Sequence, residues 1–201
     1  MREVVPGIWH WSAEHPRIKI VVHSYYLPEE RVLIDPIAPD EGLDWFAEHG
    51  PPTDVVLTNR HHYRSSGEFE ERFGVTVRCV REGLHEFGAG RTVEPFDLGD
   101  RPIEGLVVHG VGAICPDETA VHIPARQALA LADGAVRWEP GGKLAFVPDG
   151  FMDDPEQTKE GLRAAYRRLA EELEFEHLLL AHGEPFVGDG REALRAFAEG
   201  R

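Results

Sequence analysis

The sequence predicts an α/β fold in which two β-sheets pack face to face and helices cover their outer sides. Three observations favour this architecture. The first half of the 201 residues alternates short β-branched runs with helical segments, the middle is rich in short apolar runs, and the last third contains two helices around one strand. Elements that are apolar on one face must bury that face against another layer.

The first half begins with strand signals. A β-branched and aromatic run ends at a Pro-Glu-Glu turn and is followed by a second short apolar run, which predicts a hairpin. Asp40 is placed to cap the first helix. The expected elements are strands over 18–27 and 31–36, a helix over 40–49, a strand over 54–57, a helix over 66–73 and a strand over 75–80.

The second half turns from strands to helices. Asp154 followed by Pro155 is a typical helix start, with a capping side chain and proline at the first helical position. Leu162, Tyr166 and Leu169 then recur at helical spacing. The expected elements are strands over 106–108, 119–123 and 127–132, a long helix from 155, a strand over 178–180 and a helix over 191–198. No repeat or low-complexity linker interrupts the chain, so one domain over 1–201 is expected.

The amino-acid composition argues against several classes of binding partner. The net charge of −15 argues against nucleic acid and against an anionic membrane surface. No apolar run approaches the roughly 20 residues that span a bilayer, and the first residues show no signal-peptide core, so a cytoplasmic protein is expected. Cys79 and Cys115 lack the spacing of a disulfide framework or a structural zinc site. The oligomeric state stays open.

The polar loop after the strand over 54–57 carries the most informative side chains. Residues 57–67 read LTNRHHYRSSG and lead from an apolar strand into a helical segment. This layout resembles the His-x-His-x-Asp-His loop of the metallo-β-lactamase superfamily. Further segments are similar to the superfamily in the same order: an opening strand over 4–9, a strand ending in Asp35, a strand ending in Asp133, and a final loop with His182 and Gly183.

The resemblance implies an αββα four-layer sandwich, with two mixed sheets flanked by helices. It also implies seven metal-ligand positions. These positions fall on Asn59, His61, Tyr63, Arg64, Ile114, Asp133 and His182. Only His61, Asp133 and His182 keep a ligating side chain of the expected type. Since a hydrolytic centre needs about three protein ligands and an open position, neither half of a dinuclear zinc site is expected to be intact.

Arg64 strengthens the expectation of a metal-free centre. A guanidinium stays charged and repels a divalent cation, so Arg64 is expected to stand where a metal stood and to pair with Asp133. Asn59 and Tyr63 would complete a hydrogen-bonded network there, with Ile114 in the position of the lost histidine. No cofactor is therefore favoured.

A single metal ion is the alternative for the centre. Zinc or iron on His61, Asp133 and His182 would form a set of two histidines and one carboxylate. His62 or His109 is available as an unexpected additional ligand.

Two other candidates have plain structural interpretations. Cys115 could act as a nucleophile with His61 or His109 as its base, but a buried and inert thiol is favoured. The pair Asp117-Glu118 is expected in a solvated turn or at the start of a strand, with ligand recognition as the alternative.

The interpretation favoured from the sequence is a divergent protein of this fold that binds a small molecule or has lost hydrolysis. Two alternatives remain. One is a mononuclear metal-dependent hydrolase of an ester, thioester or lactone, and the other is a structural or partner-binding protein.

Overall fold

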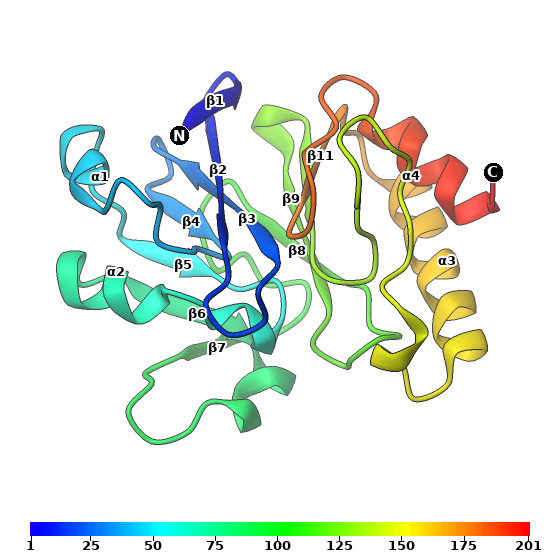
Figure 1. Cartoon of the computed structure of the whole chain (residues 1–201), viewed down its shortest axis with the longest axis horizontal. Helices are drawn as coiled ribbons and strands as arrows, with labels where there is room; N and C mark the ends of the chain where they lie inside the picture. Colours follow the sequence, from blue (N-terminus) through cyan, green and yellow to red (C-terminus); the bar gives the residue numbers. More distant parts are fainter.

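The computed structural model describes residues 1–201 and forms four layers in the order helices, sheet, sheet, helices (Figure 1). The first sheet contains β1 (Arg2–Val5), β2 (Ile8–Glu14), β3 (Val21–Leu27), β4 (Val32–Ile34), β5 (Asp54–Val56), β6 (Thr76–Val80) and β7 (Glu94–Phe96), in chain order. The second contains β8 (Val107–Gly110), β9 (Thr119–Ile123), β10 (Ala128–Leu131) and β11 (His177–Leu180), in the order β11-β10-β9-β8. Both sheets mix parallel and antiparallel pairs, so the predicted α/β sandwich is confirmed.

Helices cover the outer face of each sheet. The helices are α1 (Asp44–Glu48), α2 (Ser66–Phe73), α3 (Pro155–Glu172) and α4 (Gly190–Glu199), with short 3₁₀ turns η1 (Arg60–Tyr63), η2 (Arg81–Glu86), η3 (Pro124–Arg126) and η4 (Asp149–Phe151). Figure 1 shows α1 and α2 beside the first sheet and α3 and α4 beside the second. The predicted apolar stripe of α3 is fully buried at Leu162, Tyr166 and Leu169. Asp154 caps α3 as expected, by accepting a hydrogen bond from Gln157 N at 3.1 Å.

Parallel strand pairs place four chain segments at one edge of the sandwich. β4 and β5 are parallel in the first sheet, and β10 and β11 are parallel in the second. Since the carboxyl ends of parallel neighbours lie at the same edge, the residues that follow each pair are close together. Asp35 and Thr58 follow β4 and β5, while Asp133 and His182 follow β10 and β11.

Several boundaries differ from the expectation. Residues 18–20 lie in the turn before β3, where Ile18 and Ile20 are exposed. Asp40 does not cap α1, which begins at Asp44 after Leu43 and has no side-chain cap. Strand β7 and the turn η1 were not expected from the sequence, because each is only a few residues long and lacks a periodic apolar pattern.

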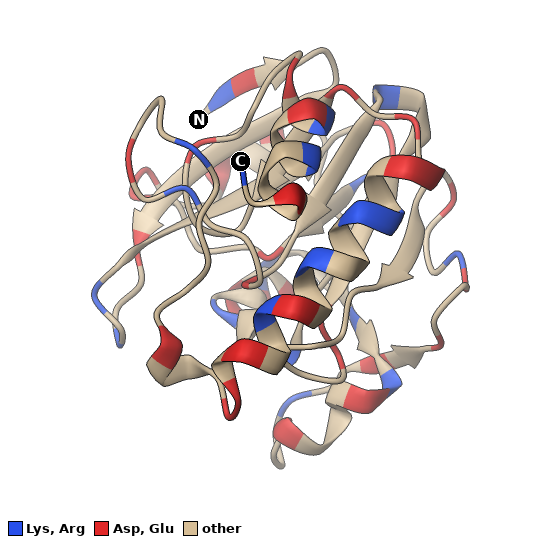
Figure 2. Cartoon of the chain, turned by 90° about the vertical axis from the view of Figure 1, so that its right-hand side faces the viewer, with Lys and Arg blue, Asp and Glu red and all other residues tan.

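The surface of α3 mixes charges of both signs. Acidic and basic residues alternate along its exposed face (Figure 2). None of the helices combines the length and apolar character that crossing a bilayer demands.

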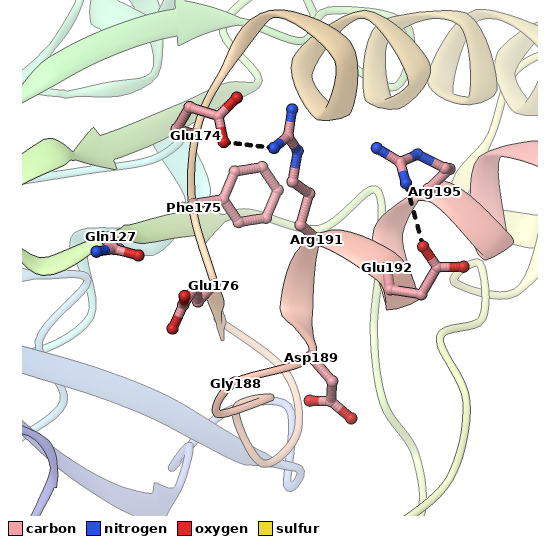
Figure 3. A pocket seen from close by; sticks show the side chains of 9 residues that line it. All are labelled: Gln127, Glu174, Phe175, Glu176, Gly188, Asp189, Arg191, Glu192 and Arg195. Carbon is pink, nitrogen blue, oxygen red and sulfur yellow. Dashed lines mark hydrogen bonds and ion pairs between the residues drawn. The ribbon is translucent and has the colours of Figure 1, made fainter.

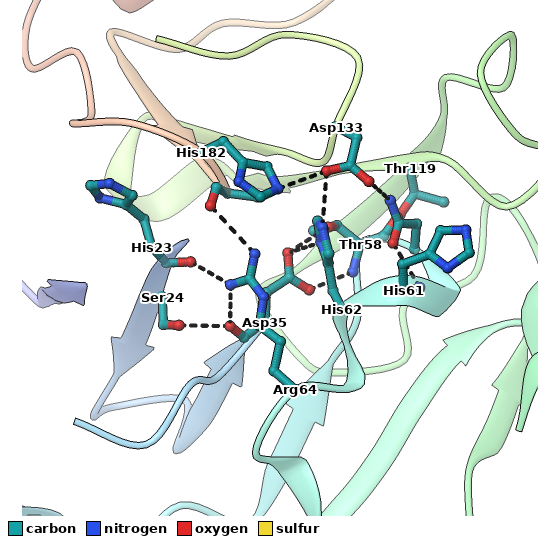
Figure 4. Close-up of polar contacts among 12 residues, drawn as sticks. His23, Ser24, Asp35, Thr58, His61, His62, Arg64, Thr119, Asp133 and His182 are labelled. Carbon is teal, nitrogen blue, oxygen red and sulfur yellow. Dashed lines mark hydrogen bonds and ion pairs between the residues drawn. The ribbon is translucent and has the colours of Figure 1, made fainter. Parts of the chain in front are cut away.

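Two polar side chains, the buried Tyr25 and the half-buried Arg64, join the sheets next to the edge where the parallel pairs end. The Tyr25 hydroxyl, on β3, donates to the carbonyl of Leu180 and accepts from its N–H, both at 2.9 Å. The Arg64 guanidinium donates to the carbonyls of His23 and Asp35 at 2.7 Å and to that of Ala181 at 3.3 Å (Figure 4). Arg64 therefore links strands of the first sheet to the end of β11.

Replacing Arg64 by methionine is expected to destabilise the fold by about 2–4 kcal/mol, because three hydrogen bonds from a charged donor are lost. The carbonyls of Asp35 and Ala181 keep a second donor, from the Ser24 hydroxyl and the His23 N–H, which limits the loss. Urea denaturation would measure the loss. Arg72→Met is the matched control, since the side chain of Arg72 is 55% exposed and pairs only with an exposed Asp44. Equal stability of the two variants would contradict this role for Arg64.

A buried histidine pair lies on β2 and β3. His10 Nε2 and His23 Nδ1 are 2.8 Å apart, and the stacked rings have centroids 5.1 Å apart. Burial and the neighbouring histidine lower the pKa of His10 to about 3. Burial is the main cause that lowers the pKa of His23 to about 4, with smaller contributions from the neighbouring His182 and the Arg64 cation. Both rings are therefore neutral in the folded protein at neutral pH.

Acid is expected to weaken the fold through this pair. The unfolded chain takes up these protons near pH 6.5 while the folded protein does not, so stability is complete above pH 6.5 and falls between about pH 6.5 and 4 by about 1.4 kcal/mol per pH unit for each histidine. Urea denaturation across this range measures the slope. His10→Gln should make it shallower, whereas exposed His85→Gln should leave it unchanged; an unchanged slope in His10→Gln would exclude this origin.

Candidate metal centre

A cluster of polar side chains occupies the edge where the parallel strand pairs end (Figure 4). Its centre is formed by His62, Asp133 and His182, whose ligand atoms all lie within 4.8 Å of one another. His62 Nε2 lies 3.1 Å and His182 Nε2 lies 2.8 Å from the same oxygen, Asp133 Oδ1. The two histidines are buried, with 4% and 9% of their surface exposed. Two nitrogen donors and one oxygen donor therefore converge on one point.

The first sheet holds His62 in place through Asp35 and Thr58. His62 Nδ1 lies 2.9 Å from Asp35 Oδ2 and 2.9 Å from the Thr58 hydroxyl. Thr58 also donates its N–H to Asp35 Oδ1 at 2.8 Å and its hydroxyl to Oδ2. The orientation of His62 is thus set by a buried carboxylate that is itself hydrogen-bonded.

The turn η1 decides which of the two adjacent histidines enters the cluster. Asn59 caps η1, because its side-chain oxygen accepts from His61 N at 2.9 Å. Successive residues of a 3₁₀ turn project about 120° apart, so His62 points inward while His61 is exposed and points away (Figure 4). The prediction that His61 is a metal ligand is therefore wrong. His62, which was expected only as an additional ligand, lies in the cluster instead. The other additional candidate, His109, lies on β8 and outside the cluster.

Glu118 belongs to the cluster, although the sequence predicted a solvated turn at this place. Glu118 is 1% exposed, and its Oε1 accepts from Gly134 N at 2.7 Å. Asn59 Nδ2 donates to Glu118 Oε2 at 3.2 Å and to Asp133 Oδ2 at 2.8 Å. The neighbouring Asp117 is also fully buried, where it binds the N–H and guanidinium of Arg60. The pair directly precedes β9, as the expected strand start has it, but the prediction that it is solvated was wrong.

The cluster distributes its protons unevenly. Burial alone would lower the pKa of His62, but the carboxylates of Asp133 and Asp35 raise it to about 9. Burial alone would raise the pKa of Asp133, but the charge of His62 and the hydrogen bonds from both histidines hold it well below its usual range. Burial lowers the pKa of His182, so this imidazole stays neutral. The cation beside Asp133 in the metal-free protein is therefore His62.

Glu118 has the opposite tendency to Asp133. Burial, reinforced by the charge of Asp133, raises the pKa of Glu118 to about 8. The hydrogen bonds from Gly134 N and Asn59 only partly offset this effect. Near neutral pH the Glu118 carboxyl therefore retains its proton.

Three residues that the sequence placed at the centre have other roles. Arg64 does not pair with Asp133, since its guanidinium is used by the three backbone carbonyls described above. Tyr63 is packed in the apolar layer on the outer side of the first sheet, with the Arg91 guanidinium 4.5 Å from its ring centre. Ile114 is half-buried in the loop before β9. The expected network of Asn59, Tyr63 and Arg64 is therefore wrong except for Asn59.

The thiol of Cys115 lies next to the cluster. Its Sγ is 3.9 Å from Glu118 Oε2. Burial and the charges of Glu118 and Asp117 raise its pKa, so the thiol stays protonated. This environment agrees with an inert thiol and not with a nucleophile.

A separate hollow of about 340 Å³ lies near the start of β11 and the start of α4 (Figure 3). Its lining is charged except for Phe175, Gln127 and Gly188. Two arginines at its wall, Arg191 and Arg195, are already paired with Glu174 and Glu192. The hollow contains none of the cluster residues and offers neither arginine unpaired.

Comparison with known proteins supports the fold. Neither a family model nor a curated protein matches the sequence. A metallo-beta-lactamase from Pontibacter korlensis has a TM-score of 0.73 at 18% identity, with 100% of this chain and 98% of that chain covered. The metallo-beta-lactamase FIM-1 from Pseudomonas aeruginosa, in a mono-zinc form, has a TM-score of 0.69 at 14% identity, with 98% and 93% covered.

A third solved structure with this likeness is a flavodiiron protein from Giardia intestinalis. Its TM-score is 0.70 at 18% identity, with 99% of this chain covered, and this chain spans 59% of that longer one. Identities this low establish the architecture and not the activity. The chain has the metallo-beta-lactamase fold.

Proposed function

We propose that this protein binds one divalent metal ion through His62, Asp133 and His182 and hydrolyses an ester, thioester or lactone. The convergence of both Nε2 atoms on Asp133 Oδ1 is the observation that carries the proposal. The set of two histidines and one carboxylate suits zinc or iron(II) and leaves coordination positions open to water and substrate.

The surroundings of the three residues fit such an ion. A metal-ligating histidine commonly donates the N–H of its second ring nitrogen to a carboxylate. In His62 this nitrogen is Nδ1, which lies 2.9 Å from Asp35 Oδ2. Asp133 is oriented through its other oxygen by Asn59. Arg64 does not compete for Asp133, because backbone carbonyls occupy its guanidinium. This removes the main objection that the sequence raised against a metal ion.

A bound divalent ion would supply Lewis acidity, which polarises a substrate carbonyl and makes water more acidic. The protein's own groups prepare the site for this chemistry. Asp35 and Thr58 fix the ring of His62, and Asn59 keeps Oδ1 of Asp133 directed at both imidazoles. The carboxyl group of Glu118, which Asn59 connects to Asp133, keeps its proton near neutral pH.

Two neighbours in fold support a metal-binding role. One solved structure is described as a mono-zinc form and another as a flavodiiron protein. The fold therefore accommodates a single zinc ion, and it also occurs in a protein described by its iron content.

A metal-free cleft that binds a small molecule is the second candidate. It is favoured by the same hydrogen bonds, because protonated His62 neutralises Asp133 without an ion. Elemental analysis of protein purified without chelator separates the two, since a metal-free protein would exclude the hydrolase.

Separate alanine substitutions of the two adjacent histidines, His61 and His62, test which of them is a metal ligand. His62→Ala is expected to weaken zinc binding more than about 100-fold, because one of three ligands is lost. His61→Ala is the matched control and should bind zinc like the wild type, since His61 points away from the cluster. Equilibrium dialysis with elemental analysis measures both affinities, and equal losses in the two variants would contradict the assignment.

Metal affinity is expected to rise with pH. His62 must release its proton to ligate, and its pKa in the metal-free protein is about 9, so zinc affinity should increase about tenfold per pH unit between pH 6.5 and 9. Where metal binding also releases the Glu118 proton, whose pKa is about 8, the rise below pH 8 steepens to about a hundredfold per pH unit. Calorimetry in buffers of different ionisation enthalpy counts these protons. Affinity independent of pH over this range would exclude His62 as a ligand.

A further inference from the structure

Asn59 lies between two carboxyl groups of the centre, those of Asp133 and Glu118. Its Nδ2 is 2.8 Å from Asp133 Oδ2 and 3.2 Å from Glu118 Oε2, so the two hydrogens of one amide serve one carboxylate each. Asn59 and Glu118 are each 1% exposed. A neutral donor thus bridges two acidic groups, of which Glu118 is buried and Asp133 is half-buried.

Tyr166 adds a second polar group beside Glu118. Its hydroxyl is fully buried and has no hydrogen-bond partner. A Cβ built on Gly134 would clash with this hydroxyl and come within 3.2 Å of Glu118 Oε1, so both groups border the space above Gly134. A buried hydroxyl without a partner next to a carboxyl is an available oxygen donor.

The Asn59 amide contacts one oxygen of each carboxylate, and the unpaired Tyr166 hydroxyl lies on the other side of Glu118, near Oε1. Carboxylate and hydroxyl oxygens are the donors that hard divalent ions such as Mn²⁺ and Mg²⁺ prefer. The amide hydrogens now occupy the position that such an ion would take between the carboxylates.

We propose that the Asn59 amide fills a second cation position, between Asp133 Oδ2 and Glu118 Oε2, and so limits the centre to one metal ion. The statement that the centre holds one metal ion rests on the proposed function. The second cation position does not rest on it, since that position depends only on Asn59, Glu118 and Asp133 Oδ2.

Asn59→Asp tests the proposal with little change of shape. The substitution keeps the oxygen that caps η1 and replaces the bridging donor by a third carboxylate oxygen. After dialysis against Mn²⁺, elemental analysis should give about one ion per chain more than the wild type. Thermal unfolding provides a second measurement: Mn²⁺ should raise the melting temperature of Asn59→Asp more than that of the wild type.

Glu118→Gln in the Asn59→Asp background is the matched control and should return the count to that of the wild type. If Asn59→Asp does not fold without metal, Asn59→His supplies an uncharged ligand at the same place and should gain the same ion. A count equal to the wild type in both folded variants would overturn the proposal, as would an extra ion that survives Glu118→Gln, or two ions in the wild type.

The outcome for the wild type separates this proposal from the proposed function. A wild type that binds no ion ends the hydrolase assignment. A gain of about one ion in Asn59→Asp that requires Glu118 would still support the second position in that case.

Discussion

The contact of Asp133 Oδ1 with two imidazoles is the interaction on which the site depends. His62 comes from the first sheet, whereas Asp133 and His182 follow parallel strands of the second. The Asp133 side chain is only 21% exposed, and a carboxylate largely removed from water is costly unless it is paired, so Asp133 is stabilised by a cation or metal ion among its partners. The two sheets therefore meet at this carboxylate, and the residues around it are arranged to satisfy it.

Arg64 shows how a charge can stabilise a site without entering it. The sequence suggested an ion pair with Asp133, which a single buried guanidinium would satisfy. The chain instead turns sharply at Arg64, with a φ of 43°, and directs the guanidinium to three carbonyls at the seam of the sheets. Arg64 thus holds the frame in which Asp133 and the histidines meet, and it leaves the carboxylate free for other partners.

The sequence was sufficient for the architecture and for two of the three residues of the centre, Asp133 and His182. Asp133 and His182 follow apolar strands directly, and strand ends are readable from hydrophobic runs. His62 was not distinguishable from His61, because a single 3₁₀ turn decides which ring faces inward and such a turn has no periodic signal. Glu118 was missed for another reason: acidic pairs are usually solvated, and only the packing of two sheets and α3 around it shows that it is buried.

The charges of the cluster explain how the same residues suit a proton or a metal ion. Without metal, the carboxylates of Asp35 and Asp133 are balanced by Arg64 and protonated His62, and Glu118 is neutral. Two of these groups hold protons that are lost near or just above neutral pH. Exchange of the His62 and Glu118 protons for one divalent ion leaves the net charge of the buried site unchanged. Because an uncompensated charge would be expensive in this interior, the raised pKa values of His62 and Glu118 are what allow a metal ion to enter without a new counter-ion.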